Sequence, residues 1–311
     1  MWKSRLFRFA LGATRKLNPF LGVLGLEDNR LVRRLKGAGR RKMLAWMASS
    51  GELILIGVDG FRMYVFNRPH FLSIYLAGSY ESHTARLFKG AVRPGATVLD
   101  IGANVGYFSL IAARQAGMRG KVYAFEPGPD NFDILRRNIQ MNELTNIEAV
   151  PKAVSDESGS ATLSLAETPD QHSLFSPPMV ATTARVTVQC ITVDDFMKEH
   201  TVDVIKMDIE GNELCALDGM RKMIMRSQAL TMFVELNPSC LRQARAEPEE
   251  LIGKLESLGF RLQVIDEESR SLRTVTSEFA REIDARPPGW FVNLYCVKGP
   301  VCSSAASSGA D

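Results

Sequence analysis

The chain lacks the cysteine patterns of disulfide-bonded and zinc-binding proteins. Its 311 residues include five cysteines, an odd number, with irregular spacing and neither a C-x-x-C pair nor a His/Cys cluster. These absences argue against a disulfide framework and against a structural zinc site. A reducing compartment suits such a chain, and we expect a cytoplasmic protein.

Long apolar segments are also missing. No stretch of the sequence approaches the ~18 apolar residues that a membrane-spanning helix requires. The first twenty residues carry basic side chains without an unbroken apolar core, so we expect no secretory signal. Hydrophobic residues nevertheless make up 45% of the chain, which allows a sizeable core without disulfide or metal support.

Positive charge is concentrated at the N-terminal end. Residues 1–42 hold twelve Lys/Arg and two acids, a local charge of +10, whereas the rest holds 26 basic and 33 acidic residues, or −7. This acidic body argues against a nucleic-acid partner, because a surface that binds nucleic acid is basic. The basic segment fits two alternatives: an amphipathic helix peripheral to the inner face of an anionic membrane, or a solvated arm.

Four segments follow one another along the chain. They are a basic helical extension (1–50), a hairpin and helix lead-in (51–95), a main α/β domain (96–299) and a small polar tail that we expect to be disordered (300–311). The hairpin is predicted around Asp59-Gly60, a dipeptide typical of tight turns because glycine accepts positive φ.

Strands and helices alternate from residue 96 onward. Short apolar runs predict strands at 97–101, 122–125, 147–150, 202–207, 230–236, 260–265 and 290–297. The alternation predicts an α/β, Rossmann-like fold, with a mostly parallel sheet and helices on both faces. A β insertion at about 155–190, between the third and fourth strands, contains two further strand-like segments, ATLSL and RVTVQC.

The strongest local signal is VLDIGANVGYFSL, in which Asp100 ends the first strand. Gly102, Asn104 and Gly106 shape the turn into the next helix, and glycines there allow backbone N–H groups to approach a ligand closely. Ligands of open α/β sheets bind beyond the carboxyl ends of the strands, where this loop is expected. A tight turn without any ligand would use the same residues.

Glu126 strengthens the case for a ligand. It ends the second strand twenty residues after Gly106, where a carboxylate can accept both hydroxyls of an adenosine ribose. The loop departs from G-x-G-x-x-G, and the acid at position 100 would repel a pyrophosphate, so NAD fits poorly. S-adenosylmethionine, which carries an ammonium and a sulfonium, fits better.

In these features and in further segments, the chain resembles the FkbM-type family of S-adenosylmethionine-dependent methyltransferases. The matching segments lie in family order over roughly residues 78–238 and are GSYESHTARLFKG, VLDIGANVGYFSLIA, VYAFEPGPDNFDILRRNIQMN, AVSDESGSATLSL, ITVDDFM, VIKMDIEGNELCALDGM and FVELNP. The resemblance implies a class I methyltransferase domain that methylates, typically at oxygen, sugars or other natural-product hydroxyls. It implies a cofactor pocket lined by Asp100, Gly102, Asn104, Gly106, Glu126 and Ala153.

A second group of polar residues follows the fourth and fifth predicted strands. Asp208 and Glu210 come after the fourth strand, and Glu235 and Asn237 end the fifth, so all four can reach the same edge of the sheet. Asp208 or Glu210 is a candidate base for a hydroxyl proton, or a ligand for sugar hydroxyls. A divalent metal on these acids is possible but not favoured, and capping of the following helix is the alternative interpretation.

Other polar residues are weaker candidates. Glu81 is expected to close over the methionine end of the cofactor, although it also suits a helix cap. His83 and His172 titrate near neutrality but read more simply as surface histidines. Lys206 interrupts an apolar strand, either as an extended residue whose ammonium reaches solvent or as a charge partner of Asp208.

We therefore expect an enzyme that transfers a methyl group from S-adenosylmethionine to a hydroxyl of a sugar, glycan or natural-product acceptor. Methylation at a nitrogen of a small molecule or peptide is one alternative. An NAD-dependent oxidoreductase and a membrane-surface adaptor with a degenerate methyltransferase fold are the others.

Overall fold

A computed structural model of the chain describes residues 53–68, 80–167, 171–175, 181–276, 279, 282–283 and 285–299. The expectations for the basic extension and for the polar tail lie outside these residues. The chain divides into two compact units, residues 1–59 with 65–78, and residues 60–64 with 79–311. All of the site described below belongs to the second unit.

The predicted hairpin is confirmed. β1 (Leu53–Val58) and β2 (Phe61–Phe66) form a two-stranded sheet. Both turn residues have positive φ, 48° at Asp59 and 77° at Gly60, as a tight hairpin turn requires.

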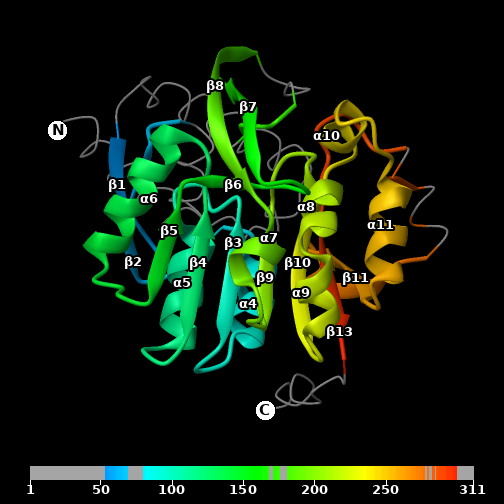
Figure 1. Cartoon of the computed structure of the whole chain (residues 1–311), viewed down its shortest axis with the longest axis horizontal. Helices are drawn as coiled ribbons and strands as arrows, with labels where there is room; N and C mark the ends of the chain where they lie inside the picture. The colour runs from blue at the N-terminus through cyan, green and yellow to red at the C-terminus, as the bar shows by residue number, and fades with distance from the viewer. Residues whose placement is uncertain are drawn as a thin grey trace, which may run out of the picture. The chain divides into compact units, whose positions relative to one another are not determined.

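The main sheet of the second unit has eight strands in the order β12-β11-β13-β10-β9-β3-β4-β5 (Figure 1). Five consecutive strands, from β10 to the edge strand β5, are parallel: β3 (Thr97–Ile101), β4 (Lys121–Phe125), β5 (Ile147–Val150), β9 (Val204–Met207) and β10 (Leu230–Leu236). The other three, β11 (Arg261–Asp266), β12 (Ser271–Thr274) and β13 (Val292–Lys298), pair antiparallel to their neighbours. The expected mostly parallel α/β sheet is confirmed.

Chain order reverses between β3 and β9. The chain proceeds from β3 to β4 and β5 in one direction, and from β9 to β10 in the other. Because parallel crossovers are right-handed, the helices of the two halves cover opposite faces of the sheet. They are α4 (Ser82–Ala91), α5 (Tyr107–Ala116), α6 (Pro129–Met141), α7 (Val193–Met197), α8 (Glu213–Gly219), α9 (Arg221–Arg226), α10 (Pro238–Gln243) and α11 (Pro248–Ser257). Such a reversal leaves a crevice at the carboxyl ends of β3 and β9.

The predicted insertion forms a separate three-stranded sheet, with β8 (Thr182–Ile191) between β6 (Lys152–Val154) and β7 (Gly159–Ala166). β7 and β8 pair antiparallel, and β6 pairs parallel to β8. Figure 1 shows β7 and β8 standing beyond one end of the main sheet. The insertion thus supplies a wall above that end.

The core is built from the apolar strands. Leu99, Ile101, Phe125, Ile205 and Met207 are completely buried and belong to one large cluster. This cluster continues through the helices of the β9–β10 half of the sheet. The carboxyl ends of β3, β4 and β9 therefore extend from a densely packed core.

Two asparagines, Asn138 in α6 and Asn142 at its C-cap, bind the backbone of β2 as a neighbouring strand would. The Asn138 side-chain amide accepts from Tyr64 N at 2.6 Å and donates to Tyr64 O at 2.9 Å. Asn142 does the same with Arg62, at 3.2 and 2.8 Å. Both pairs satisfy backbone groups of β2 that point away from β1.

Within the described part of the chain, no helix has the length and apolar character needed to cross a bilayer.

Candidate active site

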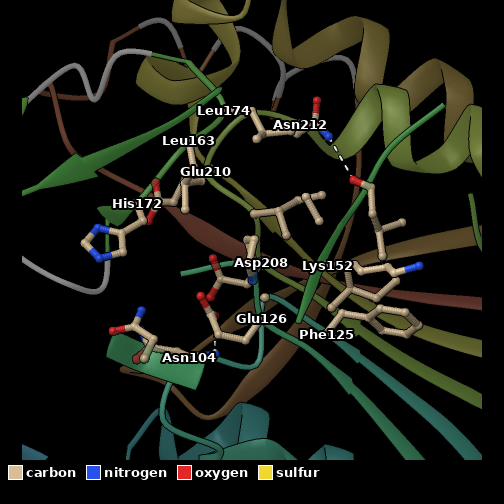
Figure 2. Close-up of a pocket in the computed structure, with 17 residues that line it drawn as sticks. Asn104, Phe125, Glu126, Lys152, Leu163, His172, Leu174, Asp208, Glu210 and Asn212 are labelled. Atoms are coloured by element: carbon tan, nitrogen blue, oxygen red, sulfur yellow. Dashed lines mark hydrogen bonds between the residues drawn. The ribbon is translucent and has the colours of Figure 1, made fainter. Parts of the chain in front are cut away.

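A cavity lies at the carboxyl ends of β3, β4 and β9, where the strand order reverses. Its wall includes six residues singled out by the sequence: Gly102, Asn104, Glu126, Ala153, Asp208 and Glu210. Figure 2 shows Asn104, Glu126 and Asp208 grouped on one side, and Leu163, Leu174 and Asn212 on the other. The same cavity is therefore lined by residues at the ends of β3, β4 and β9 and by residues of the insertion.

Gly102 is required by a close backbone approach. Its φ is +81°, and a Cβ atom there would lie 1.9 Å from the backbone oxygen of Asp208. The turn after β3 is thus packed directly on the segment after β9. Asn104 also has positive φ, 50°, and its buried Oδ1 makes no hydrogen bond of standard geometry with the described residues. Asn104 Oδ1 is a ready acceptor in the wall of the cavity.

Glu126 links the loop after β3 to the segment after β4 through hydrogen bonds. Its carboxylate accepts backbone hydrogen bonds from Asn104 N and Gly128 N, each at 2.8 Å. Burial raises the pKa of Glu126 to about 7, although the two N–H groups favour the ionised form. The Asn131 side chain also donates to this carboxylate. A carboxylate has about four lone-pair sites, so with three donors bound one is left for a ligand.

Asp100 and Gly106 lie beneath the loop and do not line the cavity. The Asp100 carboxylate is buried and accepts a hydrogen bond from the Ser109 hydroxyl of α5. Burial raises the pKa of Asp100 to about 6. A Cβ atom at Gly106 would meet the side chain of Leu135 at 2.7 Å, so this glycine permits packing on α6. Direct contact of Asp100 or Gly106 with a cofactor stays a prediction.

Three carboxylates meet beside the cavity. Oxygen atoms of Asp208, Glu210 and Glu235 lie within 4.8 Å of one another, as their positions at neighbouring strand ends predicted. Burial, followed by the charges of Asp208 and Glu210, raises the pKa of Glu235 well above its usual value. Such an oxygen set could hold a hard divalent cation. The expectation that no metal is required stays a prediction.

Lys206 is the cation beneath this cluster. Its side chain is 2% exposed, and its Nζ lies 3.4 Å from Asp208 Oδ2 and 5.3 Å from the centre of the Phe108 ring. Burial alone would lower the lysine pKa, but the charges of Asp208 and then Glu81 and Glu235 outweigh it and hold the pKa above its usual range. Lys206 is therefore a buried charge partner, and its ammonium does not reach solvent.

The segment Asp208–Glu213 owes its shape to two residues. Gly211 has a φ of +104°, and a Cβ atom there would lie 2.5 Å from the backbone oxygen of Cys240. The Glu213 carboxylate turns back and accepts from Ile209 N and Gly211 N, each at 3.3 Å. Glu213 thus binds N–H groups of the loop that precedes α8, whereas the N-cap residue of α8, Asn212, makes no side-chain capping hydrogen bond.

Glu81 is a buried acid at the start of α4. Neither oxygen of its carboxylate makes a hydrogen bond of standard geometry with the described residues. Burial raises the pKa of Glu81 to about 7, and Lys206 is the nearby charge that opposes this shift. Glu81 does not line the cavity, so its predicted contact with the cofactor stays a prediction.

The insertion contributes residues that the sequence did not single out. Leu163 and Leu174 line the cavity, and Ser173 Oγ donates to Glu210 O at 2.7 Å. His172 also lines it, with Nδ1 accepting from Ala166 N at 3.1 Å. The sequence singled out His172 but favoured a surface position, and only the fold brings it to the cavity.

His83 lies in α4 away from the cavity, and its backbone N–H donates to Glu267.

Cys240 is the main residue that sequence reasoning missed. This buried cysteine lies in α10, and its Sγ is 2.9 Å from Glu210 Oε2. Burial and the adjacent Glu210 carboxylate raise the pKa of the thiol, so Cys240 carries its proton and donates. A lone cysteine belongs to no recognisable motif, and only the three-dimensional packing reveals its partner.

Comparison with known proteins agrees with this geometry. Residues 100–262, just over half of the chain, match the family model described as the Methyltransferase FkbM domain. This match extends from the end of β3 into β11 and so includes the cavity-lining residues named above.

Several curated relatives share parts of this region. The hexuronic acid methyltransferase AglP of Haloferax volcanii is 29% identical over 143 residues, which cover 45% of this chain and 56% of that protein. The methyltransferase sdnD of Sordaria araneosa is 26% identical over 155 residues, covering 40% and 60%. The 31-O-demethyl-FK506 methyltransferase FkbM of Streptomyces tacrolimicus is 42% identical over 69 residues, covering 22% and 25%. The chain thus spans little more than half of the length of the first two relatives.

Proposed function

Because the chain belongs to the FkbM methyltransferase family, we propose that it transfers a methyl group from S-adenosylmethionine to a hydroxyl of a sugar, glycan or natural-product acceptor. The observation that carries this proposal is the excess of hydrogen-bond acceptors at the cavity. Glu126 accepts from Asn104 N, Gly128 N and the Asn131 side chain and keeps a further lone pair. Asn104 Oδ1 is buried and has no donor among the residues that the structure describes. These acceptors favour a ligand that carries hydrogen-bond donors and positive charge.

S-adenosylmethionine meets these requirements. Its ribose hydroxyls are donors for Glu126, and its ammonium and sulfonium groups are the charges that the carboxylates of Asp208 and Glu81 favour. A dinucleotide would bring a pyrophosphate into the same carboxylate-rich site, which disfavours the NAD-dependent alternative.

The proposed chemistry is an in-line displacement. When bound, the cofactor supplies a methyl carbon activated by positive sulfur. Asp208 or Glu210 accepts the proton of the acceptor hydroxyl as the new O–C bond forms, and the electrons of the broken S–C bond remain on sulfur. The Lys206 ammonium forms an ion pair with Asp208, with Nζ 3.4 Å from Oδ2, and so orients this carboxylate. The protein's main contribution is to align the acceptor oxygen with the methyl group and to exclude water.

The relatives support the acceptor class. AglP is named for a hexuronic acid and FkbM for 31-O-demethyl-FK506, a sugar and a natural product respectively. To identify the acceptor itself, we would incubate the protein with methyl-labelled cofactor and small-molecule or glycan extracts of the source organism. Label on an oxygen of a sugar or natural product is expected, whereas label on nitrogen would favour the alternative reaction.

Glu126→Ala tests the cofactor assignment. Loss of a carboxylate that bonds both the loop and the ligand should weaken S-adenosylmethionine binding at least about tenfold. Isothermal titration calorimetry measures this, and Asp133→Asn, an exposed change in α6, is the control that should leave affinity unchanged. Unchanged affinity of Glu126→Ala would count against the assignment.

Asp208→Asn tests the proposed base. We expect turnover to fall by about a hundredfold, the lower range of general-base contributions, with little change in cofactor affinity. Initial rates and calorimetry on the same preparation separate the two effects. A fully active variant would remove Asp208 from the mechanism and leave Glu210 as the candidate.

We also propose that the basic residues 1–42 give the protein a peripheral contact with anionic membranes. Their local charge of +10 supports this contact. The full chain should co-sediment with vesicles containing anionic lipid and dissociate at high salt, whereas neutral vesicles are the control. Equal recovery with both kinds of vesicle would contradict the proposal.

A further inference from the structure

The Glu210 carboxylate stands in an arrangement that electrostatics alone would not maintain. One of its oxygens lies within 4.8 Å of an oxygen of Asp208 and of Glu235, and carboxylates this close repel one another when they are ionised. Glu210 itself is only partly buried, so its side chain has solvent available as an alternative. Its backbone is in the left-handed region, with φ of 51°, which a non-glycine residue keeps only when its surroundings hold it.

The surroundings that hold Glu210 come from two elements. Ser173 of the insertion donates its hydroxyl to Glu210 O. Cys240 of α10 makes two contacts with the same loop, because its thiol bonds Glu210 Oε2 at 2.9 Å and its carbonyl oxygen packs where a Cβ of Gly211 would be. Backbone and side chain of Glu210 are thus anchored by different parts of the fold.

Cys240 is itself fixed. It lies in the first turn of α10, where Asn237 Oδ1 accepts from Cys240 N at 3.4 Å. The same Asn237 donates its amide to Glu235 Oε1, also at 3.4 Å. The first turn of α10 therefore contacts two of the three carboxylates, Glu235 through Asn237 and Glu210 through Cys240.

We propose that Cys240 is a positioning residue, whose thiol holds the Glu210 carboxylate beside Asp208 and Glu235 in the geometry needed for methyl transfer. The inference rests on the proposed function, since it assigns Glu210 to the acceptor side of that site. Cys240 touches neither acceptor nor cofactor in this assignment. It acts by keeping the Glu210 side chain in the cluster through the hydrogen bond from the thiol to Glu210 Oε2.

The first test compares side chains at position 240. Cys240→Ala removes the donor and should lower kcat about tenfold, with the Kd for S-adenosylmethionine within about twofold of wild type. Cys240→Ser keeps a donor and should recover most of kcat. The matched control is Cys296→Ala, which removes another buried thiol in β13, away from the site, and should leave kcat unchanged even if the melting temperature falls. Equal losses in Cys240→Ala and Cys240→Ser would overturn the proposal.

A double-mutant cycle asks whether Cys240 acts through Glu210. In a Glu210→Ala background, adding Cys240→Ala should produce no further loss of kcat, because the shared interaction is already gone. A tenfold further loss would show that Cys240 acts elsewhere, and the proposal would fail.

A readout independent of activity separates this inference from the proposed function. The S–H stretching band of Cys240, obtained as the wild-type minus Cys240→Ala Raman difference, should move to higher wavenumber in Glu210→Ala as the hydrogen bond is lost. An unmoved band overturns the Cys240–Glu210 bond whether or not the enzyme is active. Absence of methyl transfer by the wild type with a moved band would instead overturn the proposed function.

Discussion

At the scale of single residues, the site holds more buried carboxyl groups than buried cations. Burial raises the pKa of Glu81 and of Glu126 to about 7, and of Asp100 to about 6. Among the described residues, Lys206 is the one cation buried with them. Ionisation of these acids therefore destabilises the folded state of the free protein. A cationic ligand would reduce this destabilisation, because its positive charge favours the ionised carboxylates.

Glu81→Gln should make the free protein more stable above neutral pH. The folded-state pKa of Glu81, about 7, is above its ordinary 4.5, so its contribution to stability is complete below pH 4.5 and is lost as pH rises through 7. Glutamine cannot ionise and escapes this loss. Denaturation without cofactor should show little difference from wild type at pH 5 and a gain of up to about 3 kcal/mol at pH 8.

The control for this experiment is Glu256→Gln, an exposed change in α11 that should show the same small effect at every pH. A difference between Glu81→Gln and wild type that is independent of pH would show that the Glu81 carboxylate is not destabilising in the folded protein.

Residue spacing predicted some of these positions and not others. The sequence placed Glu126 at the cavity because it directly follows β4, which pairs in parallel with β3. The predicted contact of Asp100 with the cofactor stays a prediction, and the structure adds a hydrogen bond to its carboxylate from Ser109 of α5 that the sequence pattern did not indicate. Cys240 and Ser173 have no local signature, since each acquires its role through a partner more than 25 residues away.

At the scale of elements, the turn after β3 and the loop after β9 depend on each other. Gly102→Ala would place a Cβ 1.9 Å from the Asp208 backbone oxygen, at a φ that alanine disfavours. We expect a loss of at least about 3 kcal/mol in the free energy of unfolding, together with loss of cofactor binding. Urea denaturation and calorimetry measure the two effects.

Gly253→Ala is the matched control for Gly102→Ala. Gly253 lies exposed in α11, and a Cβ there would meet nothing within 4 Å. Alanine in a helix interior should raise stability by about 0.5–1 kcal/mol. A tolerated Gly102→Ala variant, with affinity like that of Gly253→Ala, would refute the dependence of the two loops.

Element prediction succeeded where the pattern was local. The five parallel strands and the two extra strands of the insertion follow from apolar runs, and all are present. β6 was missed because its three residues follow Pro151 and pair with β8, which is far away in the sequence. β12 was missed because its burial is slight, so no apolar alternation marks it.

At the scale of the whole molecule, the cavity joins the two halves of the sheet. Its wall contains residues of the β3–β4 half, such as Glu126, and of the β9 half, such as Asp208. A ligand bound there contacts both halves and exists only on the folded chain. The order of strands that creates this junction, with β13 between β10 and β11, depends on long-range pairing that no local pattern of the sequence specifies.

Saturating S-adenosylmethionine should therefore stabilise the entire second unit. At one hundred times Kd, the free energy of unfolding should rise by about 2.7 kcal/mol, measured as an upward shift in Tm that grows with cofactor concentration. Glu126→Ala should need more cofactor for the same shift. A Tm that does not respond to the cofactor would contradict binding to the native state.

The hydrogen bonds from the Asn138 and Asn142 amides to β2 also bear on aggregation of the protein. An unpaired strand border invites pairing with another chain, and Asn138 and Asn142 occupy that border at Tyr64 and Arg62. Replacing both asparagines with alanine would uncover it, and the protein would then be prone to intermolecular strand pairing and fibrous aggregation. We therefore expect light scattering to show faster aggregation of the double variant than of the wild type, and equal aggregation would contradict a protective role of the two amides.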